Sequence, residues 1–217
     1  MRKILLTSLI IIFFAGCSLQ TPKNEWQYKS SNAFSSYTKN FLSDNNALAQ
    51  NDLKRAIKHA KQSANITQLA RIYLGECALN ISVGKESKCE KYKDISALID
   101  NQELDAYYDF IILSYQDNTI KNLPKHYREF ATHLDSSHYN KTHEDIVSMK
   151  KATSSLLAGA LIKNHLDEKT RKHLLEIASF HGYKKAVLFW LGEELKILKD
   201  EKSIQNIKQK IMLLRSQ

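Results

Sequence analysis

The sequence predicts an all-α fold built as an array of antiparallel helix hairpins, either a solenoid or an irregular helical bundle. The 217 residues include only 6 glycines and 2 prolines, too few turn-forming residues for a β-sandwich or barrel. Apolar residues also recur at intervals of three and four along most of the chain, which is the spacing of an amphipathic helix. Helices joined by short polar turns satisfy both observations.

The first half of the chain shows this spacing clearly. A first helix is expected from about residue 32 to 43, where Ala33, Tyr37 and Phe41 fall on one face. The polar run 43–46 can cap a second helix that continues to Ala60. Further helices are expected over 67–80, 94–98, 103–116 and 124–134, the last opened by Pro124.

The second half predicts longer helices. A continuous helix is expected over 144–163, because its centre is apolar. Asp167 is a typical N-cap for a helix over 168–180, which His181 and Gly182 end. Two more helices, over 183–199 and 201–215, complete the predicted domain.

The N-terminus has the pattern of an export signal. Arg2 and Lys3 precede the largely apolar run Ile4–Phe14, which is followed by the small residues Ala15 and Gly16. This run is far shorter than the roughly twenty residues that span a bilayer as a helix. We therefore interpret residues 1–16 as a signal peptide rather than a transmembrane anchor.

The sequence Phe14-Ala15-Gly16-Cys17 resembles the lipobox of bacterial lipoproteins, with Phe14 where leucine is usual. The resemblance implies that the Cys17 thiol carries an acylated lipid and becomes the first residue after cleavage. It also implies an outer-membrane location, since Ser18 stands where aspartate usually signals inner-membrane retention. Residues 17–31 are mostly polar and are interpreted as the lipidated N-terminus and tether of a helical domain over 32–217.

The two other cysteines are expected to pair. An exported chain enters an oxidising compartment, where Cys77 and Cys89 could form a disulfide. Gly84 and its polar neighbours suggest a chain reversal near Val83, and a helical hairpin folded there would bring the two cysteines together. A straight helix would hold them about 18 Å apart. Two free buried cysteines are the alternative.

Three segments resemble helical repeats. Residues 182–190 and 52–60 are similar to the second helix of a tetratricopeptide unit, and residues 70–78 resemble the core of Sel1-like repeats. The resemblance implies paired helices whose small residues allow close approach. No constant period continues along the chain, so ordinary helix packing, which also places alanine at crossings, remains the alternative.

No residue set predicts catalysis, and we expect no enzyme, cofactor or metal site. Ser36 and Lys39 match S-x-x-K and residues 43–45 read Ser-Asp-Asn, but in the penicillin-binding enzymes these motifs lie far apart in sequence. The eight histidines lack the spacing of a metal site on one helix face. The net charge of +9 is interpreted as a solvated lysine-rich surface, with attraction to anionic lipids or acidic polymers as the alternative.

The expected function is therefore a membrane-anchored lipoprotein that binds a protein or acts as a scaffold in the cell envelope. Its partners would be the membrane, through the lipid on Cys17, and an unidentified protein, with no nucleic acid. Aromatic residues left exposed beside Arg55 or Arg71 could form a peptide groove, although core packing is the simpler role for them. A surface adhesin and a cell-wall enzyme or its regulator are the two alternatives.

Overall fold

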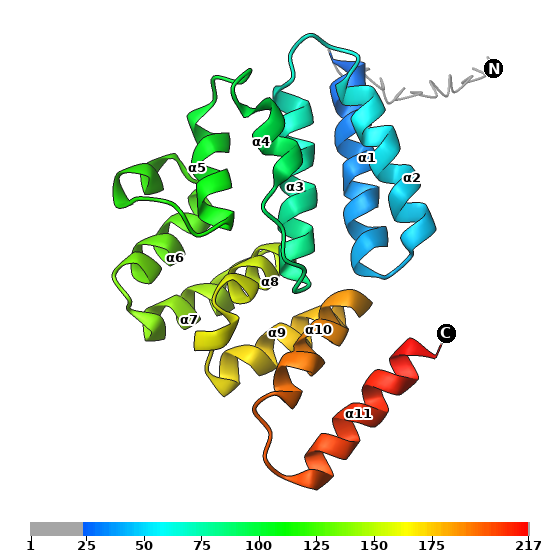
Figure 1. Ribbon diagram of the computed structural model, residues 1–217, viewed down its shortest axis with the longest axis vertical. Coiled ribbons are helices and arrows are strands. Elements are labelled where there is room, and N and C mark those ends of the chain that lie inside the picture. Colours follow the sequence, from blue (N-terminus) through cyan, green and yellow to red (C-terminus); the bar gives the residue numbers. More distant parts are fainter. Residues whose placement is uncertain (1–23, 217) are drawn as a thin grey trace, which may run out of the picture.

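The computed structural model describes residues 24–216, and this part of the chain is helical with no β-strand (Figure 1). The predicted fold class is confirmed. The α-helices span Glu25–Leu42 (α1), Asn46–Ala60 (α2), Thr67–Ser82 (α3), Glu90–Ser96 (α4), Gln102–Ile111 (α5), Lys125–Asp135 (α6), Tyr139–Ser148 (α7), Ala152–Leu161 (α8), Glu168–Phe180 (α9), Lys184–Leu195 (α10) and Glu201–Arg215 (α11). Two 3-10 helices, Asp117–Asn122 (η1) and Lys163–His165 (η2), lie between them.

Neighbouring helices pack in pairs, but the chain also returns on itself. The α1–α2 hairpin leads into the central helix α3, after which α4 to α7 extend along one side (Figure 1). Helix α8 then comes back to pack against α3, and α10 contacts α1. In a solenoid each unit contacts only its neighbours along the chain. The contacts α3–α8 and α1–α10 therefore make the fold closer to the predicted irregular bundle.

One large apolar cluster unites the middle of the molecule. It draws side chains from α3 through α10, and its fully buried members include Phe110, Phe130, Leu156 and Leu174. Rings at the centre contact one another, as Phe110 does with Phe130 at a centroid distance of 5.9 Å. Smaller clusters attach the α1–α2 hairpin to α3. The core therefore lies around α3 and α8, where the returning chain meets the outgoing one.

Helix α11 is attached much more sparsely. Its only buried residues are Ile207 and Ile211, which pack with Leu191 of α10. Met212 and Leu213, one and two residues further along, are 64% and 73% exposed. Figure 1 shows α11 at one end of the molecule, alongside α10. The C-terminal helix thus leaves part of its apolar surface uncovered.

Helix α1 begins at Glu25, earlier than the predicted start near residue 32. Residues 25–31, expected to belong to the tether, are helical. Ser30 is fully buried, and its hydroxyl donates to the carbonyl of Ala56 at 3.0 Å. The tether was predicted to extend to residue 31 because these residues are mostly polar. A small hydroxyl side chain can nevertheless be buried at a helix crossing when its hydrogen bond is made.

The helix predicted over 144–163 is wrong, because the chain leaves the helical conformation between α7 and α8. Met149 and Lys151 have ψ angles of 123° and 120°, which are extended. No glycine or proline marks the break. Helix α7 packs chiefly against α6 and α8 chiefly against α3, while both contact α9. Tertiary contacts with different partners therefore override a continuous helical pattern.

The remaining boundaries follow the predictions more closely. Asp167 caps α9 by accepting from the amide of Thr170 at 2.7 Å, and Gly182 ends the turn after α9 with a φ of 65°. The short fourth helix begins earlier than expected, and α5 ends at Ile111, short of residue 116. No helix of the described chain is long and apolar enough to cross a membrane. The signal peptide over 1–16 and the lipidation site Cys17 lie outside the described residues.

Candidate functional site

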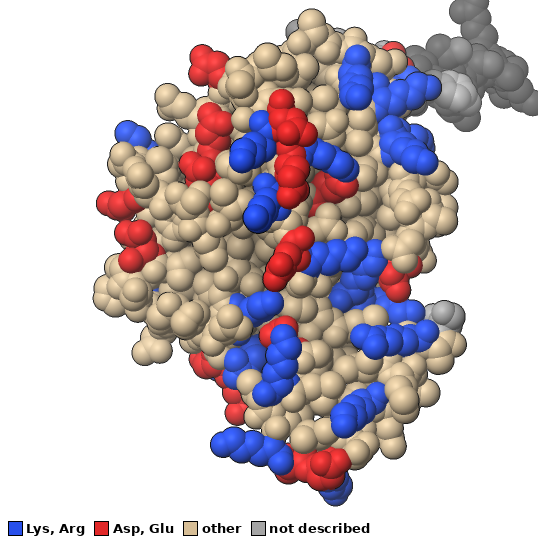
Figure 2. Space-filling model, viewed as in Figure 1, with Lys and Arg blue, Asp and Glu red and all other residues tan. Residues whose placement is uncertain are grey.

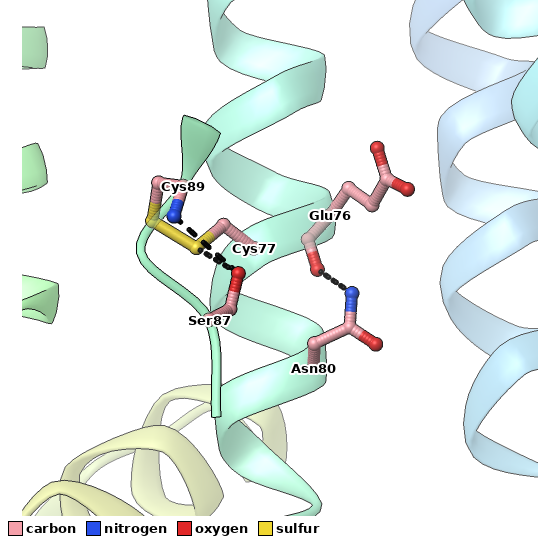
Figure 3. Close-up of a disulfide and its surroundings, with 5 residues drawn as sticks. All are labelled: Glu76, Cys77, Asn80, Ser87 and Cys89. Carbon is pink, nitrogen blue, oxygen red and sulfur yellow. Dashed lines mark hydrogen bonds between the residues drawn. A yellow bond between two sulfur atoms is a disulfide. The ribbon is translucent and has the colours of Figure 1, made fainter. Parts of the chain in front are cut away.

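The predicted pairing of Cys77 with Cys89 is present (Figure 3). The two residues form a disulfide with Cα atoms 5.3 Å apart, one on α3 and the other immediately before α4. The returning arm differs from the expected helical hairpin, because residues 85–88 run back along α3 without helical structure and Cys89, just before α4, has a left-handed φ of 54°. We call residues 84–89 the strap. The disulfide therefore fastens the strap to the central helix.

Gly84 makes the reversal at the start of the strap possible. Its φ of 77° lies in the left-handed region, which favours glycine. A Cβ atom at this position would also lie 2.3 Å from the ring of Phe189, on α10. The predicted position of the turn, near Val83 and Gly84, is thus confirmed. Both ends of the strap are fixed, one by this close contact and the other by the disulfide.

A pocket of about 560 Å³ lies between the strap, α5 and the end of α8. We call it the lysine pocket. Four lysines and two glutamates stand around it, namely Lys85, Lys88, Lys93, Lys163, Glu86 and Glu90. Its apolar lining includes Ile81, Ile111, Ile112, Ala160 and Leu161. Basic side chains also gather across the middle of the face shown in Figure 2. The pocket combines an apolar wall with a predominantly basic rim.

A second cavity, of about 450 Å³, lies between α9, α10 and α11. We call it the C-terminal groove. Its apolar lining consists of Leu175, Trp190, Leu191, Ile197, Leu198 and Ile207. Charged residues of both signs also line it: Glu168, Glu176, Glu194, Arg171, Lys172 and Lys210. The sparsely attached helix α11 contributes to one wall, so the shape of the groove depends on how firmly that helix is held.

Two buried donors on the lining of the C-terminal groove find no hydrogen-bond partner among residues 24–216. They are Nε1 of Trp190 and Nε of Arg171. Trp190 is only 2% exposed, and the Arg171 guanidinium uses Nη1 to donate to the carbonyl of Leu166. Buried donors are nearly always paired in folded proteins. An acceptor brought by a bound molecule would remove this deficit only if the side chains that cover the two donors moved aside.

The Ser-Asp-Asn sequence at 43–45 has a structural role at the turn between α1 and α2. Lys185 of α10 lies in contact with this turn, with Nζ 3.7 Å from Oδ1 of Asp44 and donating to Oδ1 of Asn46 at 2.6 Å. The same Nζ lies 4.0 Å from the centroid of the Phe41 ring. Burial lowers the pKa of the Lys185 ammonium, which Asp44 partly opposes. These contacts join the first hairpin to α10.

Two histidines also link helices. Nδ1 of His133 lies 2.6 Å from Oδ2 of Asp145, which connects α6 with α7. The buried His143 donates from Nε2 to the carbonyl of His165 at 2.9 Å, and its Nδ1 lies 3.3 Å from Asp167. Within residues 24–216, no three His, Cys, Asp or Glu side chains are grouped as metal ligands. His133 and His143 therefore hold neighbouring helices and turns together.

Most aromatic residues that could have formed a groove beside Arg55 or Arg71 pack in the core instead. Phe110 and Trp190 are buried, and Tyr107 stacks on Tyr127 with ring centroids 5.9 Å apart. Burial raises the pKa of Tyr127 to about 12. Sequence reasoning missed the C-terminal groove, because its lining comes from three helices and the unpartnered state of Trp190 has no sequence pattern.

Comparison with known proteins finds no relative of this chain. No protein-family model, curated protein or solved structure matches the chain. The candidate sites therefore depend on the geometry and chemistry of their own residues, and the C-terminal groove and the lysine pocket both offer an apolar surface together with charged groups.

Proposed function

We propose that this protein is a lipid-anchored outer-membrane protein whose helical domain binds a protein partner in the cell envelope. The observation that carries the proposal is the C-terminal groove, where two buried donors, on Trp190 and Arg171, lack acceptors beside an apolar lining. The lipobox resemblance at Cys17 supports the anchor, and the disulfide is consistent with an oxidising compartment.

A protein segment matches the chemistry of the C-terminal groove. A bound segment would offer backbone carbonyl groups as acceptors to Trp190 Nε1 and Arg171 Nε once α11 shifts to expose these buried atoms, while its apolar side chains would cover Leu175 and Leu198. The lining carries both acidic and basic residues, so it does not select a strongly charged partner. We therefore expect an amphipathic segment with a mainly apolar contact face. Helix α11 can adjust to it, because few buried contacts hold that helix.

Site-specific photocrosslinking in living cells tests the binding proposal. A photoreactive residue replaces Lys172 or Lys210 beside the groove, and in a control it replaces the exposed Lys61 that follows α2. We expect discrete protein adducts from the two groove positions and none of the same mass from Lys61. Mass spectrometry of the adducts then identifies the partner.

A charge inside the groove provides the second control. Ile197 is 47% exposed and lines the groove, so Ile197→Asp should leave the fold intact while removing the adducts. Leu98→Asp, at a 74% exposed position that does not line the groove, should leave them unchanged. Adducts that persist in Ile197→Asp, or that form equally at Lys61, would reject the groove as the binding site.

The anchor is tested separately. Cells fed a labelled fatty acid should incorporate it into the wild-type chain and not into Cys17→Ser. Protease added to intact cells should spare a domain that faces the periplasm. Degradation of the domain under these conditions would contradict a periplasmic binding role and favour a surface-exposed adhesin. Absence of label in the wild type would reject the lipid anchor without affecting the groove.

A further inference from the structure

We propose that the lysine pocket binds a small anionic amphiphile, a molecule with one phosphate or carboxylate head and a short alkyl chain, and that the disulfide-held strap positions the residues that recognise it. This site is distinct from the C-terminal groove and does not depend on the proposed protein partner. Its ligand class follows from the charge of the rim, the composition of the lining, and the way the strap is fixed.

The rim of the pocket has an excess of positive charge. Four lysines face two glutamates around it. Among the described residues, none of these four ammonium groups takes part in a salt bridge. Lys85 and Lys163 instead lie near aromatic rings, 5.5 Å from the centroid of Phe41 and 5.8 Å from that of Phe189. An anionic head bound here would meet several unpaired cations at once.

The interior of the pocket is apolar. Of its lining residues, Ile111 and Ala160 are buried, and Ile81, Ile112 and Leu161 are partly buried. Its volume of about 560 Å³ is within the range of small-molecule sites. A free inorganic anion would leave this surface exposed to water, whereas an alkyl chain attached to the anion would cover it. The combination therefore favours an amphiphile over a simple ion.

The disulfide determines where one wall of the pocket stands. Lys85, Glu86 and Lys88 belong to the strap, whose last residue, Cys89, is bonded to Cys77 of α3. The Ser87 hydroxyl lies 3.2 Å from Sγ of Cys77 and accepts from the amide of Cys89 at 3.4 Å (Figure 3). Because the wall is ordered before binding, the ligand does not have to immobilise it. Reduction of the disulfide should therefore weaken binding.

Calorimetric titration of the full chain in phosphatidylcholine vesicles tests the ligand class, with protein-free vesicles as the blank. The probes are octyl phosphate and octanoate, with inorganic phosphate as the head alone and octyl glucoside as a neutral amphiphile. We expect saturable binding of one or both anionic amphiphiles, at least about ten-fold tighter than either control. Equal binding of inorganic phosphate, equal binding of octyl glucoside, or no saturable binding of either anionic amphiphile would overturn the proposal.

Paired substitutions locate the site. Lys88→Gln with Lys163→Gln should weaken binding about three- to ten-fold, because each charge contact open to solvent contributes modestly. Lys58→Gln with Lys61→Gln makes the same change of charge at the C-terminal end of α2, away from the pocket, and should have no such effect. If both pairs weaken binding equally, the pocket is not the site and only the net charge of the protein matters.

A third variant tests the apolar wall without endangering the fold. Leu113 lines the pocket, is 49% exposed and has a φ of 56°, a conformation that asparagine tolerates better than leucine. Leu113→Asn should fold normally and weaken octyl phosphate binding. Separately, Cys77→Ser with Cys89→Ser should weaken it about three-fold or more through the loosened strap. Unchanged affinity in the folded double-serine variant would show that the strap does not position the site.

Discussion

Helices α3 and α11 are of nearly equal length and are held in very different ways. Helix α3 has 16 residues, of which nine are buried, and it contacts partners on several sides as well as carrying Cys77 of the disulfide. Helix α11 has 15 residues, of which two are buried, and it packs mainly against α10. The central body is thus closed and cross-linked, whereas the C-terminal helix is a loosely attached wall.

The difference explains why the C-terminal groove is suited to binding. Buried apolar contacts set the local stability of a segment, and elements that move during binding come from the less stable parts of a protein. The unpartnered donors on Trp190 and Arg171 lie on the lining that α11 helps to cover. A partner can therefore gain hydrogen bonds and apolar contact here at the expense of a weakly held helix, while the body around α3 stays unchanged.

The largest expected loss of stability comes from the centre of the body. Phe110 is fully buried and contacts Phe130, Tyr127 and Tyr115. Phe110→Ala should lower the free energy of unfolding by about 4 kcal/mol, because it removes a large side chain and leaves a cavity. Urea denaturation followed by circular dichroism measures this change. A loss under about 1 kcal/mol would mean that the core is not centred on this ring.

The disulfide should contribute the next largest amount. Its two cysteines are separated by 12 positions in sequence, so the bond restricts a short loop of the unfolded chain. Cys77→Ser with Cys89→Ser should lower the free energy of unfolding by about 2–3 kcal/mol. The same denaturation experiment with and without reductant provides the comparison, because reductant should destabilise the wild type and leave the variant unaffected.

The cap of α9 should contribute less and depend on pH. Burial disfavours the charge on Asp167, but hydrogen bonds with Thr170 and the proximity of His143 hold the pKa of its carboxyl below the ordinary value of 3.8. Asp167→Ala should destabilise the protein by about 1 kcal/mol at neutral pH. Because the folded-state pKa is lowered, the stabilisation from ionisation is complete above about pH 4 and is lost as the pH falls through the folded-state value.

A matched variant separates the charge of Asp167 from its hydrogen bond. The substitution Asp167→Asn keeps a side-chain oxygen that can accept from the amide of Thr170 but removes the group that titrates. The stability difference between wild type and Asp167→Asn should shrink on acidification to about pH 2. A difference that grows as the pH falls would contradict the lowered pKa.

The smallest effect on the body should come from α11. Ile207→Ala removes one of the two buried side chains of that helix. We expect α11 to detach more readily while the unfolding midpoint of the body changes little, because the remaining clusters lie elsewhere. Proteolysis of the native protein should cut the variant faster between α10 and α11. Loss of cooperative unfolding throughout the molecule would show instead that α11 belongs to the body.

The same contrast explains what the sequence could predict. Helices such as α3 and α9 were visible from apolar spacing and from the cap at Asp167, because these signals are local. The disulfide was predictable because Gly84 marks a reversal beside Val83, the midpoint between the cysteines. The break between α7 and α8 was not predictable, since the two helices have different main tertiary partners, α6 and α3, and no glycine or proline lies between them.

The candidate sites were less accessible from the sequence than the helices. The C-terminal groove combines residues of α9, α10 and α11, and the lysine pocket combines the strap with α5 and α8. Nothing in the local pattern of any one segment marks these combinations. The early start of α1 was missed for a similar reason, because the buried hydrogen bond of Ser30 joins it to α2.

Native-state hydrogen exchange of the full chain tests the contrast between α3 and α11 most directly. Amides of Thr67–Ser82 should exchange only through global unfolding, whereas those of Glu201–Arg215 should exchange through local opening and be at least about 100-fold less protected. This result would establish α11 as the movable wall of the C-terminal groove. Equal protection of the two helices would contradict the account, because α11 would then be as firmly held as the core.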